Sequence, residues 1–125
     1  MAASVNPPST TLLICLSWSA QLAATFREAN ERIESTADQM NLAGPVPFIC
    51  ECSDPTCMEI VRLDIDEYED VRQHPRRFFT VPGHAEAAVQ AGAAIVAKRL
   101  PGYTLVDKIN IAGEIAEQRY DDLLS

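Results

Sequence analysis

The chain is short of basic residues. Lys and Arg number 10 against 18 Asp and Glu, which gives a formal net charge of -8. A surface this acidic repels polyanions over most of its area, which disfavours nucleic acid as a direct partner and disfavours membrane anchoring through a basic patch. Arg72, Arg76 and Arg77 form a single basic cluster, which we expect to be a solvated face, with a site for an anion or an acidic partner as the alternative. No apolar run reaches the roughly 20 residues that span a bilayer.

Familiar catalytic motifs are missing as well. The chain has only 5 glycines, and it contains no Gly-rich phosphate loop, no G-x-S-x-G nucleophile motif and no H-E-x-x-H metalloprotease motif. The acidic residues between Asp64 and Asp70 are typical of the first turn of a helix, so they need no catalytic explanation. The sequence therefore indicates no enzyme class.

The N-terminal segment also lacks basic residues, since no Lys or Arg occurs before Arg27. A secretory signal begins with positive charge, so we do not read "TLLICLSWSAQLAA" as one and expect a cytoplasmic protein with reduced cysteines. We expect residues 1–18 to be an apolar, mobile lead and residues 19–125 to form a single domain. The apolar side chains of this lead are expected to pack onto the domain or onto a second copy: Leu12, Ile14, Leu16 and Trp18.

The rest of the chain has the composition of a globular domain. Its 125 residues are 47% apolar, enough for one hydrophobic core. The hydrophobic pattern predicts, in order, a helix from about Ala20 to Met40, a hairpin formed by 46–52 and 58–64, a short helix capped by Asp64 or Asp66, a strand over 76–84, an alanine-rich helix over 85–100, a strand over 103–110 and a helix from about Ala112. This order predicts an α+β fold in which helices cover a small antiparallel sheet.

Three of the 4 cysteines lie within eight positions of the predicted hairpin. Cys50 and Cys52 are two residues apart, so on an extended strand their side chains leave the same face, about 6.5 Å apart at Cα. The turn "SDPT" then brings the chain back and allows Cys57 to approach from the second strand. The spacing therefore predicts three thiolates at the tip of one hairpin.

A fourth ligand would complete a tetrahedral site. His84 follows a Pro-Gly turn between a strand and a helix, and together with Cys50, Cys52 and Cys57 it would form the Cys3His set that is usual for structural Zn²⁺. His74 is the alternative fourth ligand, although a histidine at a helix end is more often exposed or involved in capping.

Two other interpretations of the cysteines are open. Free cysteines are among the most buried residue types, so the three could simply pack in the core, as we expect of Cys15. A close group of thiols could also form a reversible disulfide. Two cysteines that flank the acidic Glu51 do not resemble a core stripe, and this favours the metal site.

The order of motifs resembles a family of small, uncharacterised actinobacterial proteins over roughly residues 25 to 118. The motifs concerned are "FREANERIE", "F-x-CEC-x4-C", "EYE-x-VR", "RFF-x-VPGH" and "Y-x-LVDK". The resemblance implies that the three cysteines and His84 belong together, and it carries no activity with it.

The sequence thus predicts a small zinc-binding protein with a structural Cys3His site, acting as a binding or regulatory module on a protein partner or within a homo-oligomer. The alternatives are a thiol-based redox sensor and a zinc-dependent hydrolase. The hydrolase needs an open metal position, and three thiolates lower the Lewis acidity that hydrolysis requires.

Overall fold

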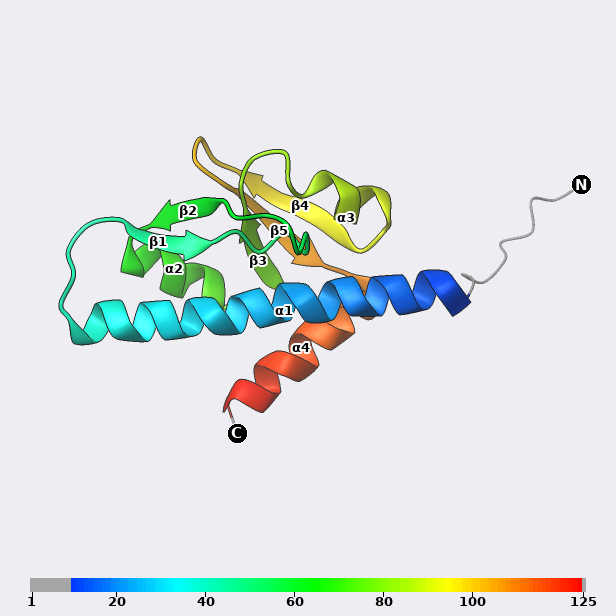
Figure 1. The fold of residues 1–125 in the computed structure, drawn as a ribbon, viewed down its shortest axis with the longest axis horizontal. Coiled ribbons are helices and arrows are strands. Elements are labelled where there is room, and N and C mark those ends of the chain that lie inside the picture. The colour runs from blue at the N-terminus through cyan, green and yellow to red at the C-terminus, as the bar shows by residue number, and fades with distance from the viewer. Residues whose placement is uncertain (1–9, 125) are drawn as a thin grey trace, which may run out of the picture.

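The structure, a computed structural model, describes residues 10–124 and the side chains of residues 17–123 (Figure 1). Helices and short strands are interspersed along the chain, and the expected α+β class is confirmed. The elements are α1 (Thr10–Gln39), β1 (Val46–Ile49), β2 (Ile60–Leu63), α2 (Ile65–Arg72), β3 (Arg77–Thr80), α3 (Glu86–Gln90), β4 (Ala94–Arg99), β5 (Thr104–Lys108) and α4 (Asn110–Leu124).

The strands form two antiparallel sheets rather than the single sheet that we expected. β1 and β2 make the predicted hairpin, with Val46 opposite Leu63. The second sheet has the strand order β3-β5-β4. The two sheets meet just beyond the end of β1, where the Glu51 N–H donates a hydrogen bond of 3.1 Å to the Phe79 carbonyl in β3.

The prediction of one alanine-rich helix over 85–100 is wrong. Helix α3 ends at Gln90, and the chain then turns at Gly92, whose φ of 73° suits glycine better than any side chain. The β-branched Ile95 and Val96 follow and pair with β5 as part of β4. Strand pairing therefore overrides the helix propensity of the alanines, because the second half of this segment pairs with β5 and completes the three-stranded sheet.

Helix α1 begins at Thr10, earlier than the predicted start near Ala20. The side chains of Leu12, Ile14 and Leu16 lie outside the described residues. The Trp18 side chain is 58% exposed, so the described chain does not bury it, and its packing onto a second copy stays a prediction. No helix within residues 10–124 is both long enough and apolar enough to cross a membrane.

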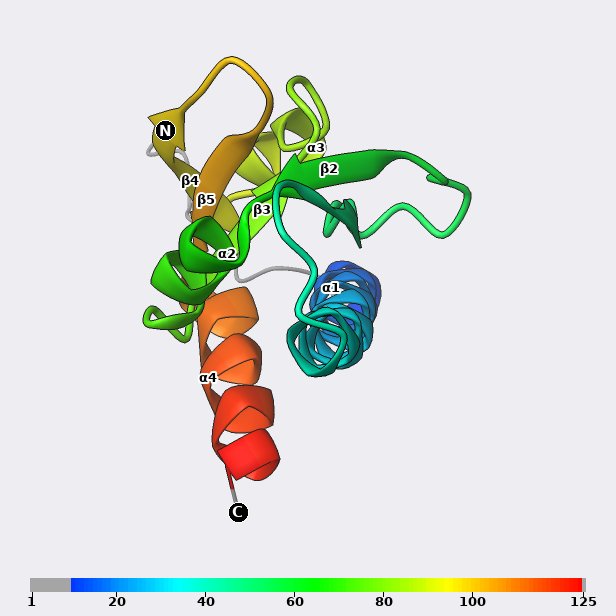
Figure 2. The same cartoon turned by 90° about the vertical axis from the view of Figure 1, so that its left-hand side faces the viewer.

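Two hydrophobic clusters hold these elements together. One is built on three aromatic rings, with Phe48 stacked on Tyr68 at 4.4 Å between centroids and Phe79 edge-on to both. The other surrounds Phe78 and Val106 between the three-stranded sheet and the helices α1, α3 and α4. Small buried residues on α1 let this helix lie close to α4 and β1. Figure 2 views α1 end-on. Tyr68, Val71, Phe78 and Phe79 are all buried.

Candidate metal centre

The loop between β1 and β2 carries the three cysteines. Strand β1 ends at Ile49, but the Cys50 N–H still bonds the Glu59 carbonyl at 3.2 Å, so the ladder extends by one residue. The chain then reverses at Asp54, whose carbonyl accepts from the Cys57 N–H at 3.1 Å and whose carboxylate accepts from the Thr56 N–H at 2.8 Å. This turn returns Cys57 to the side of Cys50.

A second turn places His84. The His84 N–H donates to the Val81 carbonyl at 3.0 Å, and the residues between them are Pro82 and Gly83. Gly83 has a φ of 91°. Proline at the second position and a left-handed glycine at the third match a type II turn, which fixes the backbone of the histidine. The imidazole is thereby directed from the end of β3 towards the hairpin loop.

The four predicted residues come together. One ligand atom from each of Cys50, Cys52, Cys57 and His84 lies within 4.8 Å of the other three. His84 Nδ1 is 3.5 Å from Cys57 Sγ and 3.7 Å from Cys50 Sγ. A tetrahedral Zn²⁺ with ordinary bond lengths would hold a nitrogen and a sulfur about 3.6 Å apart. The arrangement therefore has the dimensions of a site that could hold a metal ion.

Glu59 determines which imidazole nitrogen faces the sulfurs. His84 Nε2 lies 3.1 Å from Glu59 Oε2, on the side of the ring opposite the cysteines. A carboxylate at Nε2 holds the proton there and leaves the lone pair of Nδ1 for a metal. Sequence reasoning missed Glu59, because its role depends on the rotation of a ring that spacing alone does not define.

In the absence of a metal, the three thiols hold their protons unequally. A hydrogen bond from Cys50 is the largest cause that lowers the pKa of Cys52 to about 5, and the Asp54 backbone N–H adds to it. The same hydrogen bond, together with burial, raises the pKa of Cys50 above its ordinary range. Burial raises the pKa of Cys57. At neutral pH the thiolate of this trio is Cys52, and a metal would have to displace two thiol protons.

The Cys50 sulfur also accepts a backbone hydrogen bond. The Val81 N–H lies 3.3 Å from Cys50 Sγ. An N–H donor stabilises negative charge on sulfur, and this one connects the hairpin loop to the turn that carries His84.

Glu51, which lies between two of the cysteines, is fully buried. Its carboxylate accepts hydrogen bonds from Asn30 at 2.8 Å and from the Phe79 N–H at 3.2 Å, and it forms an ion pair with Arg72. The Asn30 amide nitrogen also donates to the Ile49 carbonyl, and the amide oxygen accepts from the Ile49 N–H. The cysteine loop is therefore attached to α1, α2 and β3 through one acidic side chain.

The expectation that the three arginines form a solvated face is wrong for Arg72. Only 7% of Arg72 is exposed, because its guanidinium binds Glu51 inside the protein. Arg76 forms an ion pair with Glu117 at the surface, and Arg77 forms one with Asp107 near the surface. Burial of Arg72 could not be read from the sequence, since its partner lies 21 residues away.

The alternative fourth ligand lies elsewhere. His74 is exposed in the turn after α2, and the metal-ligating group in the described residues contains His84 instead. The Cys15 side chain lies outside the described residues.

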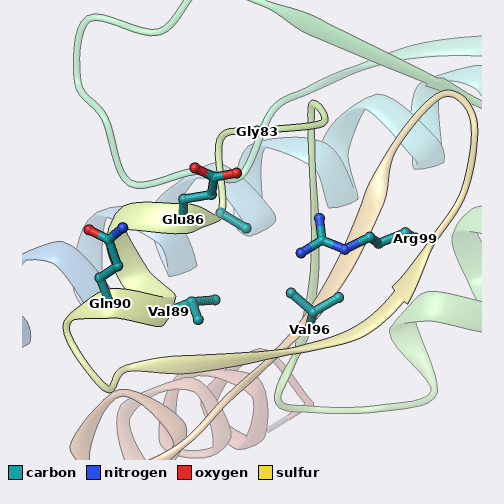
Figure 3. Close-up of a pocket in the computed structure, with 7 residues that line it drawn as sticks. Gly83, Glu86, Val89, Gln90, Val96 and Arg99 are labelled. Carbon is teal, nitrogen blue, oxygen red and sulfur yellow. The ribbon is translucent and has the colours of Figure 1, made fainter.

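A cavity of about 200 Å³ adjoins Gly83, with Glu86 and Arg99 on opposite sides (Figure 3). Both of these side chains are exposed, and the cavity contains none of the four candidate ligands.

Comparison of the chain with family models, with curated proteins and with solved structures found no match. The functional argument therefore depends on the geometry of the site.

Proposed function

We propose that the protein binds one Zn²⁺ through Cys50, Cys52, Cys57 and His84, and that the ion has a structural role. The distances from His84 Nδ1 to two cysteine sulfurs, 3.5 and 3.7 Å, carry this proposal. Three thiolates and an imidazole are soft and borderline ligands, the usual set for Zn²⁺. With four protein ligands the metal has no open position, which favours a structural role over a hydrolytic one.

The proposed task is that of a binding or regulatory module in the cytoplasm, acting on a protein partner or a second copy of the chain. Free thiols that are held for a metal fit a reducing compartment. The formal charge of -8 favours a partner other than nucleic acid. The resemblance to small actinobacterial proteins that share the C-x-C-x4-C and PGH motifs supports the grouping of the four ligands and implies no task.

Metal analysis of protein purified without a histidine tag tests the proposal directly. We expect one zinc per chain, and treatment with a chelator should release the metal and expose three thiols together in a thiol titration. A matched titration without chelator is the control. A redox sensor would give a different result, namely metal-free protein in which a mild oxidant forms a disulfide among Cys50, Cys52 and Cys57. That outcome would exclude the zinc site.

A further inference from the structure

A second cavity, of about 300 Å³, borders the cysteine loop. The cysteine loop contributes Cys52, Ser53 and Asp54 to the lining, and β5 contributes Lys108. Six alanines from α1, α3, the segment after α3 and the start of α4 supply the remaining surface together with Ser19. The volume is at the lower end of the range for sites that bind small molecules.

Lys108 is the unusual residue of this cavity. It is the last residue of β5 and only 4% exposed, on the same face of the strand as the buried Val106. Its Nζ lies 5.4 Å from the centre of the Phe78 ring, and none of the carboxylates in the described residues forms an ion pair with it. The nearby Glu51 carboxylate already binds Arg72, Asn30 and a backbone N–H.

A buried ammonium with no direct ion-pair partner is costly, and burial lowers the pKa of Lys108, although the charges of Glu51 and Cys52 oppose this shift. Lysine is almost never fully buried unless it is paired. Ser53 provides a second unused donor, because its Oγ is buried without a hydrogen-bond partner in the described structure. The cavity thus combines a cation, a hydroxyl and a wall of methyl groups.

We propose that this cavity binds a small carboxylic acid, with the carboxylate between Lys108 and Ser53 and a short apolar body against the alanines. The ammonium would supply the charge and the hydroxyl a second hydrogen bond. Asp54 is the acidic group at the rim, and it is exposed and bonded to Thr56, so it lies in water rather than beside the ammonium. The proposal does not require the zinc site, although Cys52 borders both.

Lys108 has one competing role, which is to balance the negative charge of the cysteine site. Cys52 is the cysteine that lines this cavity, and its charge favours the ammonium of Lys108, although the described contacts include no hydrogen bond between the two side chains. A counter-charge role predicts that removal of the ammonium weakens metal binding. The carboxylate role predicts that its removal leaves metal binding intact and abolishes the preference for anions.

Amide chemical shifts measured by NMR during titration with propionate and butyrate test the proposal. The titration is done on the intact protein at constant ionic strength, with propionamide as the neutral control. We expect saturable shifts at Ser53, Lys108 and Ala112, with propionate binding about tenfold or more tightly than propionamide, as one charge-assisted hydrogen bond provides. Equal binding of the two probes, or shifts elsewhere only, would overturn the proposal.

The chain contains only two lysines, so Lys98 in β4 is a matched control. Lys108→Met should abolish the preference for propionate and keep the zinc content, whereas Lys98→Met should change neither. Ser53→Ala should weaken propionate severalfold without loss of folding, which provides a test if Lys108→Met fails to fold. Loss of zinc in Lys108→Met with unchanged propionate binding in Ser53→Ala would assign Lys108 to charge balance and overturn the proposal. Zinc content is measured on the same samples, so failure of the metal proposal is seen separately.

Discussion

The carboxylate of Glu51 binds the guanidinium of Arg72 inside the protein. Glu51 lies between Cys50 and Cys52, which are two of the candidate metal ligands. Loss of one partner from a buried ion pair leaves an unpaired charge, at a cost of about 3 to 5 kcal/mol. We expect Glu51→Gln to lower the free energy of unfolding by about this amount in urea denaturation. Glu31→Gln is the control, since Glu31 also contacts Arg72 but is 39% exposed and should cost less than about 1 kcal/mol. Equal effects of the two substitutions would contradict this account.

Substitution of the proposed ligands should separate His84 from His74. Structural zinc sites draw about 10 to 16 kcal/mol from the metal in small peptides, while whole domains are stable by about 5 to 15 kcal/mol. We expect Cys52→Ser and His84→Ala each to lose zinc and to lower stability by about 3 kcal/mol or more. His74→Ala should be nearly silent in zinc content and melting temperature. If His84→Ala keeps its zinc and native stability, the assignment of the fourth ligand is wrong.

Glu59 should strengthen metal binding without touching the metal. A carboxylate that orients a histidine ligand typically contributes 10- to 100-fold in affinity, so we expect Glu59→Gln to weaken zinc binding by roughly this factor. A competition titration against a zinc indicator measures the effect. Glu86→Gln removes the same charge two residues after His84 and should leave the affinity unchanged. Equal losses in both variants would indicate a general effect of charge rather than an oriented ring.

The unequal thiols predict selective alkylation of the metal-free protein. Because the pKa of Cys52 is lowered to about 5, its reactive thiolate forms as the pH rises through that value. The raised pKa values of Cys50 and Cys57 keep these thiols protonated to alkaline pH. Iodoacetamide should therefore modify Cys52 first at neutral pH, with a rate that falls as the pH drops below about 5. Mass spectrometry of labelled peptides measures the order, and zinc should suppress all three reactions. Equal labelling of the three cysteines would refute the ordering.

Gly83 gives a test of how the backbone positions His84. Its φ of 91° is unfavourable for any L side chain, although a Cβ there would meet no atom within 4 Å. Gly83→Ala should therefore cost about 1 to 2 kcal/mol through backbone strain alone and should weaken zinc binding. Gly102→Ala adds a methyl group in equally open space without the positive φ, so it should be almost neutral in melting temperature and in zinc affinity. A neutral Gly83→Ala would mean that the turn adapts without displacing the histidine.

The sequence predicted the local features of this protein better than its long-range contacts. Strand patterns and the turn residues around Asp54 predicted the hairpin, and Asp64 starts α2 with a capping box, as expected. The gathering of His84 with the three cysteines was also predicted, because two short turns fix both segments. The burial of Glu51 with Arg72 and the split of 85–100 into α3 and β4 depend on tertiary partners, which no local pattern encodes.

The four candidate ligands lie in segments that extend from two different sheets, and this has a consequence for how the protein unfolds. The cysteines lie at the tip of the β1–β2 hairpin, and His84 lies beyond β3, 34 residues after Cys50. An ion bound at this point would act as a cross-link that closes a long loop, which reduces the entropy of the unfolded chain. With the ion bound, the hairpin and the three-stranded sheet should exchange their amide protons as one cooperative unit. Without it, the hairpin should open first while the sheet stays closed.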